Sequence, residues 1–179
     1  MFGRKKVTTA ELAGIIANIV LAPLVRPEPQ DDIFRQQAVA AGAEPNRFAF
    51  EAVALQCYAF STAIARERSE GRITGEIGEQ LVRQFMRGVH ELIVARKGVR
   101  LTDVHLSPDD ALELIMERGN KYVLWSYGQG EIHDVQKYFA EFCGVPGSDV
   151  LERIGWSLFL IRANAHGDWL KTWNIVKSE

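Results

Sequence analysis

The chain has 179 residues, of which 25% are charged and 47% hydrophobic, and its formal net charge is −2. This composition is typical of a globular domain and argues against intrinsic disorder. The balanced charge lacks the basic character of a nucleic-acid-binding domain. The two cysteines are too few for a disulfide framework. Because no linker divides the chain, we expect a single domain over residues 1–179. We also expect the protein to be located in the cytoplasm.

The N-terminal part combines a basic start with an apolar run. We expect residues 1–7 to be a disordered basic start, followed by an amphipathic core helix within the apolar run of residues 10–25. Thr8 and Glu11 have the spacing of a capping box, and Pro23 is expected to disrupt the helix. The alternative is that residues 1–25 are a targeting segment or a membrane-surface anchor.

The next segments predict a short helix and then the central helix of the fold. The short helix begins at Asp31 and ends at Gly42. Residues 48–65 contain a single charge, Glu51, and are apolar around most of a helix, which is typical of a buried helix. A membrane span would place Glu51 in lipid at high cost. We therefore predict a buried helix over residues 46–70.

Residues 74–97 show the clearest amphipathic pattern of the chain, with the apolar side chains on an arc of about 180°. Gly78 and Gly88 fall on this arc. Since glycine destabilises a helix interior, their position indicates that another backbone approaches there. The turn after Gly71 is short. We therefore predict that helices 46–70 and 74–97 form a central antiparallel pair.

The rest of the chain predicts further helices. One begins at Ser107, and whether residues 122–127 continue it or run extended is open. Residues 99–106 before it read as a loop or a short extended piece. A helix over 131–142 follows, and then one that begins at Ser148 and ends at Gly167. The apolar residues that recur along that helix are Leu151, Ile154, Leu158, Phe159 and Ile161.

Residues 168–179 contain Trp169 and Trp173 at helical spacing. We interpret this segment as a short last helix that latches onto its own domain, since tryptophan has a large apolar surface to bury. The same two side chains are the best candidates for an interaction site, because tryptophan is enriched at interface anchors. All these elements together predict an all-α, single-domain bundle of six to eight helices around the pair 46–70 and 74–97.

The sharpest enzymatic candidate is the dipeptide His133-Asp134. It resembles the His-Asp dipeptide of the metal-dependent phosphohydrolases, an all-helical family of about this size. The resemblance implies an earlier histidine and a later aspartate, for which His105 and Asp168 (or Asp149) stand in the right order. It also implies a divalent metal that activates water against a phosphate ester.

Helix geometry favours a different reading of this dipeptide. In a helix over 131–142, His133 and Asp134 point away from the apolar side that carries Val135 and Phe139. A metal site in the core needs them turned inward. We therefore expect both to be solvated surface residues.

Basic residues gather in one part of the sequence. They are Arg66, Arg68, Arg72, Arg83, Arg87, Arg96, Lys97 and Arg100. Because glutamates are interleaved among them, we expect a solvated face of mixed charge rather than an anion site.

These observations favour a non-catalytic helical module that binds a protein partner or a second copy of itself. We expect no cofactor, no bound metal and no nucleic acid, and no membrane contact except a peripheral one by the N-terminal helix. Two alternatives stay open. One is the phosphohydrolase, and the other is a carrier of a hydrophobic ligand. A carrier needs a cavity, for which the candidate lining residues are Phe48, Phe60, Phe85 and Trp156.

Overall fold

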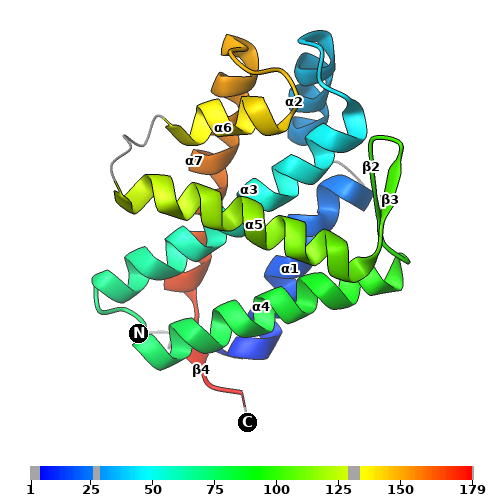
Figure 1. Cartoon of the computed structure of the whole chain (residues 1–179). Helices are drawn as coiled ribbons and strands as arrows, with labels where there is room; N and C mark the ends of the chain where they lie inside the picture. The colour runs from blue at the N-terminus through cyan, green and yellow to red at the C-terminus, as the bar shows by residue number, and fades with distance from the viewer. Residues whose placement is uncertain (1–4, 26–28, 129–133, 179) are drawn as a thin grey trace.

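The computed structural model describes residues 5–25, 29–128 and 134–178. These residues form seven helices and four three-residue strands (Figure 1). In chain order they are β1 (Lys6–Thr8), α1 (Thr9–Val25), α2 (Pro29–Ala40), α3 (Pro45–Ser69), α4 (Gly75–Ala95), β2 (Val99–Leu101), β3 (Val104–Leu106), α5 (Pro108–Gly128), α6 (Asp134–Phe142), α7 (Asp149–Thr172) and β4 (Asn174–Val176). The predicted all-α bundle is confirmed.

Helix α3 lies at the centre of the fold, and every residue from Phe48 to Phe60 is buried. Two hydrophobic clusters flank it. The α1–α4 cluster contains side chains of α1, α3 and α4 together with the first half of α5. The α6–α7 cluster contains side chains of α3, α6 and α7 together with Tyr122 of α5. Among the described helices, α3 is long and apolar enough to cross a membrane, but 83% of its most apolar window is buried inside the protein.

The predicted central pairing of α3 with α4 is not confirmed. The two helices diverge from the turn that joins them (Figure 1); α3 packs most extensively against α7, and α4 against α1. A Cβ atom on Gly78 would lie 3.2 Å from Cγ2 of Ile64 in α3, whereas one on Gly88 would lie 3.2 Å from Cβ of Ala17 in α1. Helix α4 therefore approaches α3 near the turn, and further along it packs against α1 instead of α3.

Capping residues locate the helix starts as predicted. The backbone N–H of Thr8 donates to Oε2 of Glu11 at 2.9 Å, and the N–H of Glu11 donates to Oγ1 of Thr8 at 3.2 Å, which is the capping box. Thr74, Ser107 and Ser148 each accept from the N–H three residues later. The helix after Ser107 continues to Gly128, so the open stretch 122–127 is helical.

Two helices are longer than expected. Helix α1 continues past Pro23 to Val25, since the proline lies in its last turn and few helical hydrogen bonds follow it. Helix α7 continues through Gly167 to Thr172, so the predicted helix end at Gly167 is wrong. At Gly167, a Cβ atom would lie 1.9 Å from an Arg66 guanidinium nitrogen. This glycine makes room for α3 rather than ending α7.

The described residues also form short strands, and one of them, β4 (Asn174–Val176), lies where we expected a short last helix, so that part of the prediction is wrong. Strand β1 pairs in parallel with β4, so Lys6 and Val7 are part of a ladder although the basic start was expected to run through them. Residues 1–4 of that start lie outside the described residues. The side chain of Ser178 completes the junction: its Oγ accepts the N–H of Ala10 at 2.8 Å. Strands β2 and β3 form an antiparallel hairpin over residues 99–106.

Candidate functional site

The structure does not bring the predicted metal ligands together in the part of the chain that it describes. His105 is exposed on β3, and its Nε2 lies 2.7 Å from the backbone oxygen of Lys97. Asp168 is exposed on α7, and its carboxylate lies 3.5 Å from Nζ of Lys171. The β2–β3 hairpin and the start of α6 lie at opposite sides of the molecule (Figure 1).

The other two predicted metal ligands are His133 and Asp134. His133 lies outside the described residues, and Asp134 is described only as the first residue of α6. Among the residues that the structure describes, no three His, Cys, Asp or Glu side chains are grouped closely enough to hold a metal ion.

Glu51 is the single charge in the apolar stretch of α3, and only 1% of it is exposed. Its Oε1 lies 3.4 Å from Nε of Arg118, while Oε2 has no hydrogen-bond partner among the described residues. Burial raises the pKa of Glu51, and the charge of Arg118 partly offsets that rise. The guanidinium carbon of Arg118 also lies 4.2 Å from the centre of the Phe142 ring.

The neighbours of Glu51 include two groups that could act as nucleophiles only if they were ionised, Cys143 and Tyr122. Burial raises the pKa of the Cys143 thiol and of the Tyr122 hydroxyl well above their ordinary values. Neither group is therefore ionised near neutral pH, so neither is activated as a nucleophile. The arrangement is that of a buried ion pair between helices.

A cleft of about 560 Å³ lies between α2 and the first turns of α7. The cleft is built from two helices that approach each other above the α6–α7 cluster. Its lining residues are Phe34, Gln37, Ala40, Ala41, Val150, Arg153, Ile154 and Ser157. Phe34 and Val150 are half-buried and pack against that cluster, so the floor of the cleft is continuous with the core.

Exposed apolar side chains continue this cleft along both helices. The exposed fraction is 55% for Ile33, 39% for Leu160 and 42% for Ile161. Leu160 and Ile161 follow Ser157 by three and four residues, so they lie one helical turn further along the same side of α7. We call the cleft together with Ile33, Leu160 and Ile161 the α2–α7 face.

This face was not predicted from the sequence. Ile161 was counted only as one of the apolar residues of its helix, and the structure exposes it. The available signal was that α7 carries apolar residues over a wider arc than one buried stripe requires. Helical periodicity alone does not say which part of such an arc stays in water.

The aromatic residues that were expected to line a ligand cavity pack against other rings. The ring centres of Phe60 and Phe85 lie 4.6 Å apart. Phe48 lies 5.9 Å from the Phe139 ring, and Trp156 lies 5.9 Å from the Phe159 ring.

A second pocket, of about 160 Å³, lies where α3, α4 and α5 meet, and Met86, Met116 and Val123 are among its lining residues. It is smaller than the roughly 300 Å³ at which ligand pockets begin. It is therefore too small for a hydrophobic ligand of ordinary drug or cofactor size.

The two candidate tryptophans have different surroundings. Trp173 is half-buried and packs against the α1–α4 cluster, as a latch does. Trp169 is 37% exposed on α7.

No protein-family model matches this chain, and no curated protein or solved structure is significantly similar to it.

Proposed function

We propose that this protein is a helical interaction module and that it joins a second copy of itself through the α2–α7 face. One observation carries the proposal. A largely apolar cleft of about 560 Å³, whose polar lining residues are Gln37, Arg153 and Ser157, is continued within one helical turn by exposed side chains, Ile33 on α2 and Leu160 and Ile161 on α7. Contiguous exposed apolar surface of this kind marks an interaction site in a soluble protein.

The shape of the face supports a second copy as the partner. A twofold dimer places the same surface of both subunits in contact, so that surface must complement itself. The α2–α7 face offers a hollow and, one helical turn away, protruding isoleucine and leucine side chains. In a twofold arrangement, the protruding side chains of each copy fill the hollow of the other.

A small hydrophobic ligand is the second candidate for this cleft, because its volume lies in the range of about 300–1,000 Å³ that ligand pockets occupy. A ligand confined to the cleft would leave Leu160 and Ile161 in water, however, whereas a protein partner would cover them. The position of these two side chains therefore favours a protein. The phosphohydrolase alternative receives no comparable support from the positions of His105 and Asp168.

Sedimentation equilibrium on the full chain tests the proposal. We expect the wild type to dimerise with a dissociation constant of order 1–10 μM, and Ile33→Glu and Ile161→Glu each to weaken dimerisation by about tenfold or more, since a buried unpaired charge is costly. Val94→Glu is the matched control, because Val94 is 49% exposed on α4, away from the face. It should leave dimerisation unchanged.

Two results would refute the proposal. The first is a wild type that stays monomeric at about 200 μM, far above the expected constant. The second is a dimer that persists unchanged in both face variants. A monomer that binds a fluorescent hydrophobic probe, and loses it in Ile161→Glu and Ile33→Glu, would assign the cleft to a ligand instead.

A further inference from the structure

The structure separates the basic residues that the sequence places together. Two arginines near the end of α3 are paired with a carboxylate: Arg66 and Arg72 both form ion pairs with the buried Glu67. On α4, Nε of Arg87 lies 2.8 Å from the Glu91 carboxylate. The expectation of mixed, mutually compensating charge therefore suits this part of the group.

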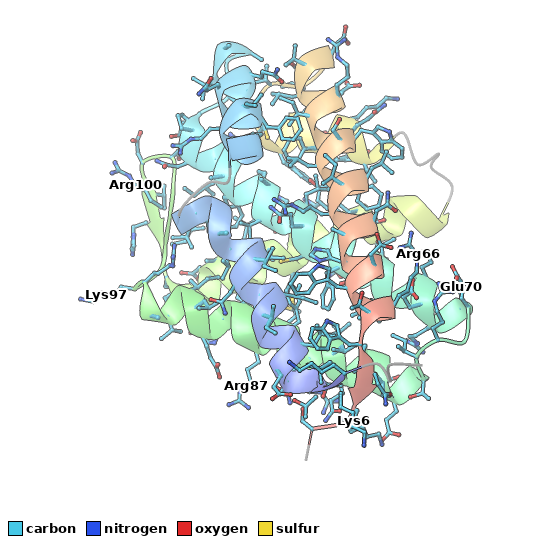
Figure 2. All side chains as sticks on the ribbon, turned by 180° about the vertical axis from the view of Figure 1, so that it is seen from behind. Lys6, Arg66, Glu70, Arg87, Lys97 and Arg100 are labelled. Carbon is cyan, nitrogen blue, oxygen red and sulfur yellow. The ribbon has the colours of Figure 1, made fainter. Side chains whose placement is uncertain are left out.

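Three other members of the group, Arg96, Lys97 and Arg100, have no carboxylate partner among the described residues. The side chain of Arg100 donates to the backbone oxygen of Thr102 at 3.3 Å, and those of Arg96 and Lys97 make no described hydrogen bond or ion pair. Figure 2 shows Lys97 and Arg100 at the hairpin edge of the molecule, on the side opposite to Arg66 and Glu70.

Arg96 and Arg100 line one pocket, of about 210 Å³, at this edge. The turn between them places both side chains there. It passes through two residues with positive φ, Lys97 at 63° and Gly98 at 109°. A Cβ atom on Gly98 would lie 2.2 Å from the backbone oxygen of Leu106, so only glycine fits between α4 and the hairpin. The positions of the two arginines thus follow from the fold.

The remaining lining residues are Leu24, Asn46, Gly98 and Val99, so the described lining contains no acidic side chain. Asn46 lies in the first turn of α3 and is half-buried. Its side-chain amide has no hydrogen-bond partner among the described residues and adds a neutral donor to the two guanidinium groups. Glu44, the acidic residue nearest to Asn46 in sequence, accepts the N–H of Arg47 at 2.7 Å.

We propose that the pocket formed by Arg96, Arg100 and Asn46 binds a phosphate group. Guanidinium groups pair with phosphate through two parallel hydrogen bonds, and two of them line the same hollow. A phosphate dianion also compensates more of the uncompensated positive charge of Arg96, Lys97 and Arg100 than a carboxylate does. This site shares no residue with the α2–α7 face, so it stands or falls independently of the proposed function.

Calorimetric titration of the full chain with inorganic phosphate, in chloride buffer at constant ionic strength, tests the site. We expect one phosphate per chain with a dissociation constant of order 1 mM. Arg96→Ala and Arg100→Ala should each weaken binding by about tenfold, and Asn46→Ala by a smaller factor. Arg83→Ala is the charge-matched control, because Arg83 is exposed on α4 and does not line the pocket. It should bind phosphate as the wild type does.

A parallel titration with adenosine monophosphate identifies the source of the phosphate. Equal affinity for both probes supports a site for the phosphate alone, and tighter binding of the nucleotide supports a site for a phosphate carried by a larger ligand. Far-UV circular dichroism verifies that each variant is folded. The proposal is overturned if the wild type binds no phosphate. It is also overturned if Arg96→Ala and Arg100→Ala bind as tightly as Arg83→Ala, or if acetate binds as tightly as phosphate.

Discussion

The two hydrophobic clusters that flank α3 are built from different side chains. In the α1–α4 cluster, most fully buried residues are aliphatic, such as Leu12, Ile16, Leu81 and Ile93. In the α6–α7 cluster, aromatic rings make up a larger share of the buried side chains. Tyr58 stacks on Tyr122 and on Phe159, with ring centres 5.4 Å apart in both pairs.

This difference relates packing to function. The aliphatic side chains of α1 and α4 interdigitate along two long helices whose close approach depends on small residues such as Ala17 and Gly88. Next to the bulkier aromatic cluster, α2 and α7 enclose the cleft of about 560 Å³. The α1–α4 cluster therefore reads as the scaffold, and the α6–α7 cluster supports the surface that we propose for partner binding.

The strongest way to break this comparison is to remove one large ring from each cluster. Phe60 and Phe139 are both fully buried. We expect Phe60→Ala and Phe139→Ala each to lower the free energy of unfolding by about 3–5 kcal/mol, through lost burial and a residual cavity. Because α3 contributes to both clusters, unfolding in urea should remain a single transition, measured by far-UV circular dichroism and tryptophan fluorescence.

Circular dichroism reports on the helices as a whole, whereas tryptophan fluorescence reports on the surroundings of single side chains. Trp156 packs against the α6–α7 cluster and Trp173 against the α1–α4 cluster. If Phe139→Ala shifts the fluorescence transition away from the circular dichroism transition, the clusters unfold separately and the comparison describes two units rather than one.

A second test uses the opposite pH dependence of two buried groups. His166, which contacts the Phe60 ring, has its pKa lowered to about 4 by burial and by the charge of Arg162. The unfolded chain therefore binds a proton more readily, so stability is full above about pH 6.5 and is lost as the pH falls toward 4. The loss amounts to roughly 3 kcal/mol. Burial raises the pKa of Glu51, so its contribution is full below about pH 4.5 and is lost as the pH rises through the folded-state pKa.

Urea unfolding between pH 4 and 8 measures both contributions. His166→Leu should remove most of the loss of stability that the wild type shows in acid. Glu51→Gln should remove the loss of stability that the wild type shows as the pH rises through the folded-state pKa of Glu51. Equal slopes of unfolding free energy against pH in the wild type and in His166→Leu would contradict the assignment of the acid loss to this histidine.

The smallest expected effects come from a matched pair of glycines. A Cβ atom on Gly155 would lie 2.7 Å from the Phe139 ring, while one on Gly119 would meet nothing within 4 Å. We expect Gly155→Ala to destabilise by about 1–3 kcal/mol through overpacking of the aromatic cluster. Gly119→Ala should stabilise by up to about 1 kcal/mol, because alanine is the better helix former. Thermal unfolding measures both effects. If Gly155→Ala is stabilising instead, the Phe139 ring can shift to accommodate the added methyl group, and the aromatic cluster is not tightly packed at this contact.

Local signals in the sequence predicted the local structure well. Capping at Thr8, Thr74, Ser107 and Ser148 needs only residues within one helical turn, so the corresponding helix starts are right. The ends at Pro23 and Gly167 are wrong, because the same residue types also occur where a helix continues. At Gly167 the reason is an arginine from α3, which no local pattern reveals.

The candidate sites were predictable to a smaller extent. The eight basic residues were recognised as a group, but only the fold shows that Glu67 and Glu91 neutralise some of them and leave Arg96 and Arg100 beside one pocket. The exposure of Ile161 was not predicted, because its helix is apolar on several sides. Which of those sides faces water depends on the position of α2, a helix that ends more than a hundred residues earlier in the chain.

The sequence by itself determined the helical class, the central buried helix and most helix starts, since hydrophobic periodicity and capping act over a few residues. Only the tertiary structure decided that α3 packs mainly against α7 and α4 mainly against α1, because many helix pairings bury an apolar stripe equally well. It likewise decided the parallel junction of β1 with β4. That ladder joins backbone segments from the two ends of the chain, and no local preference encodes such a contact.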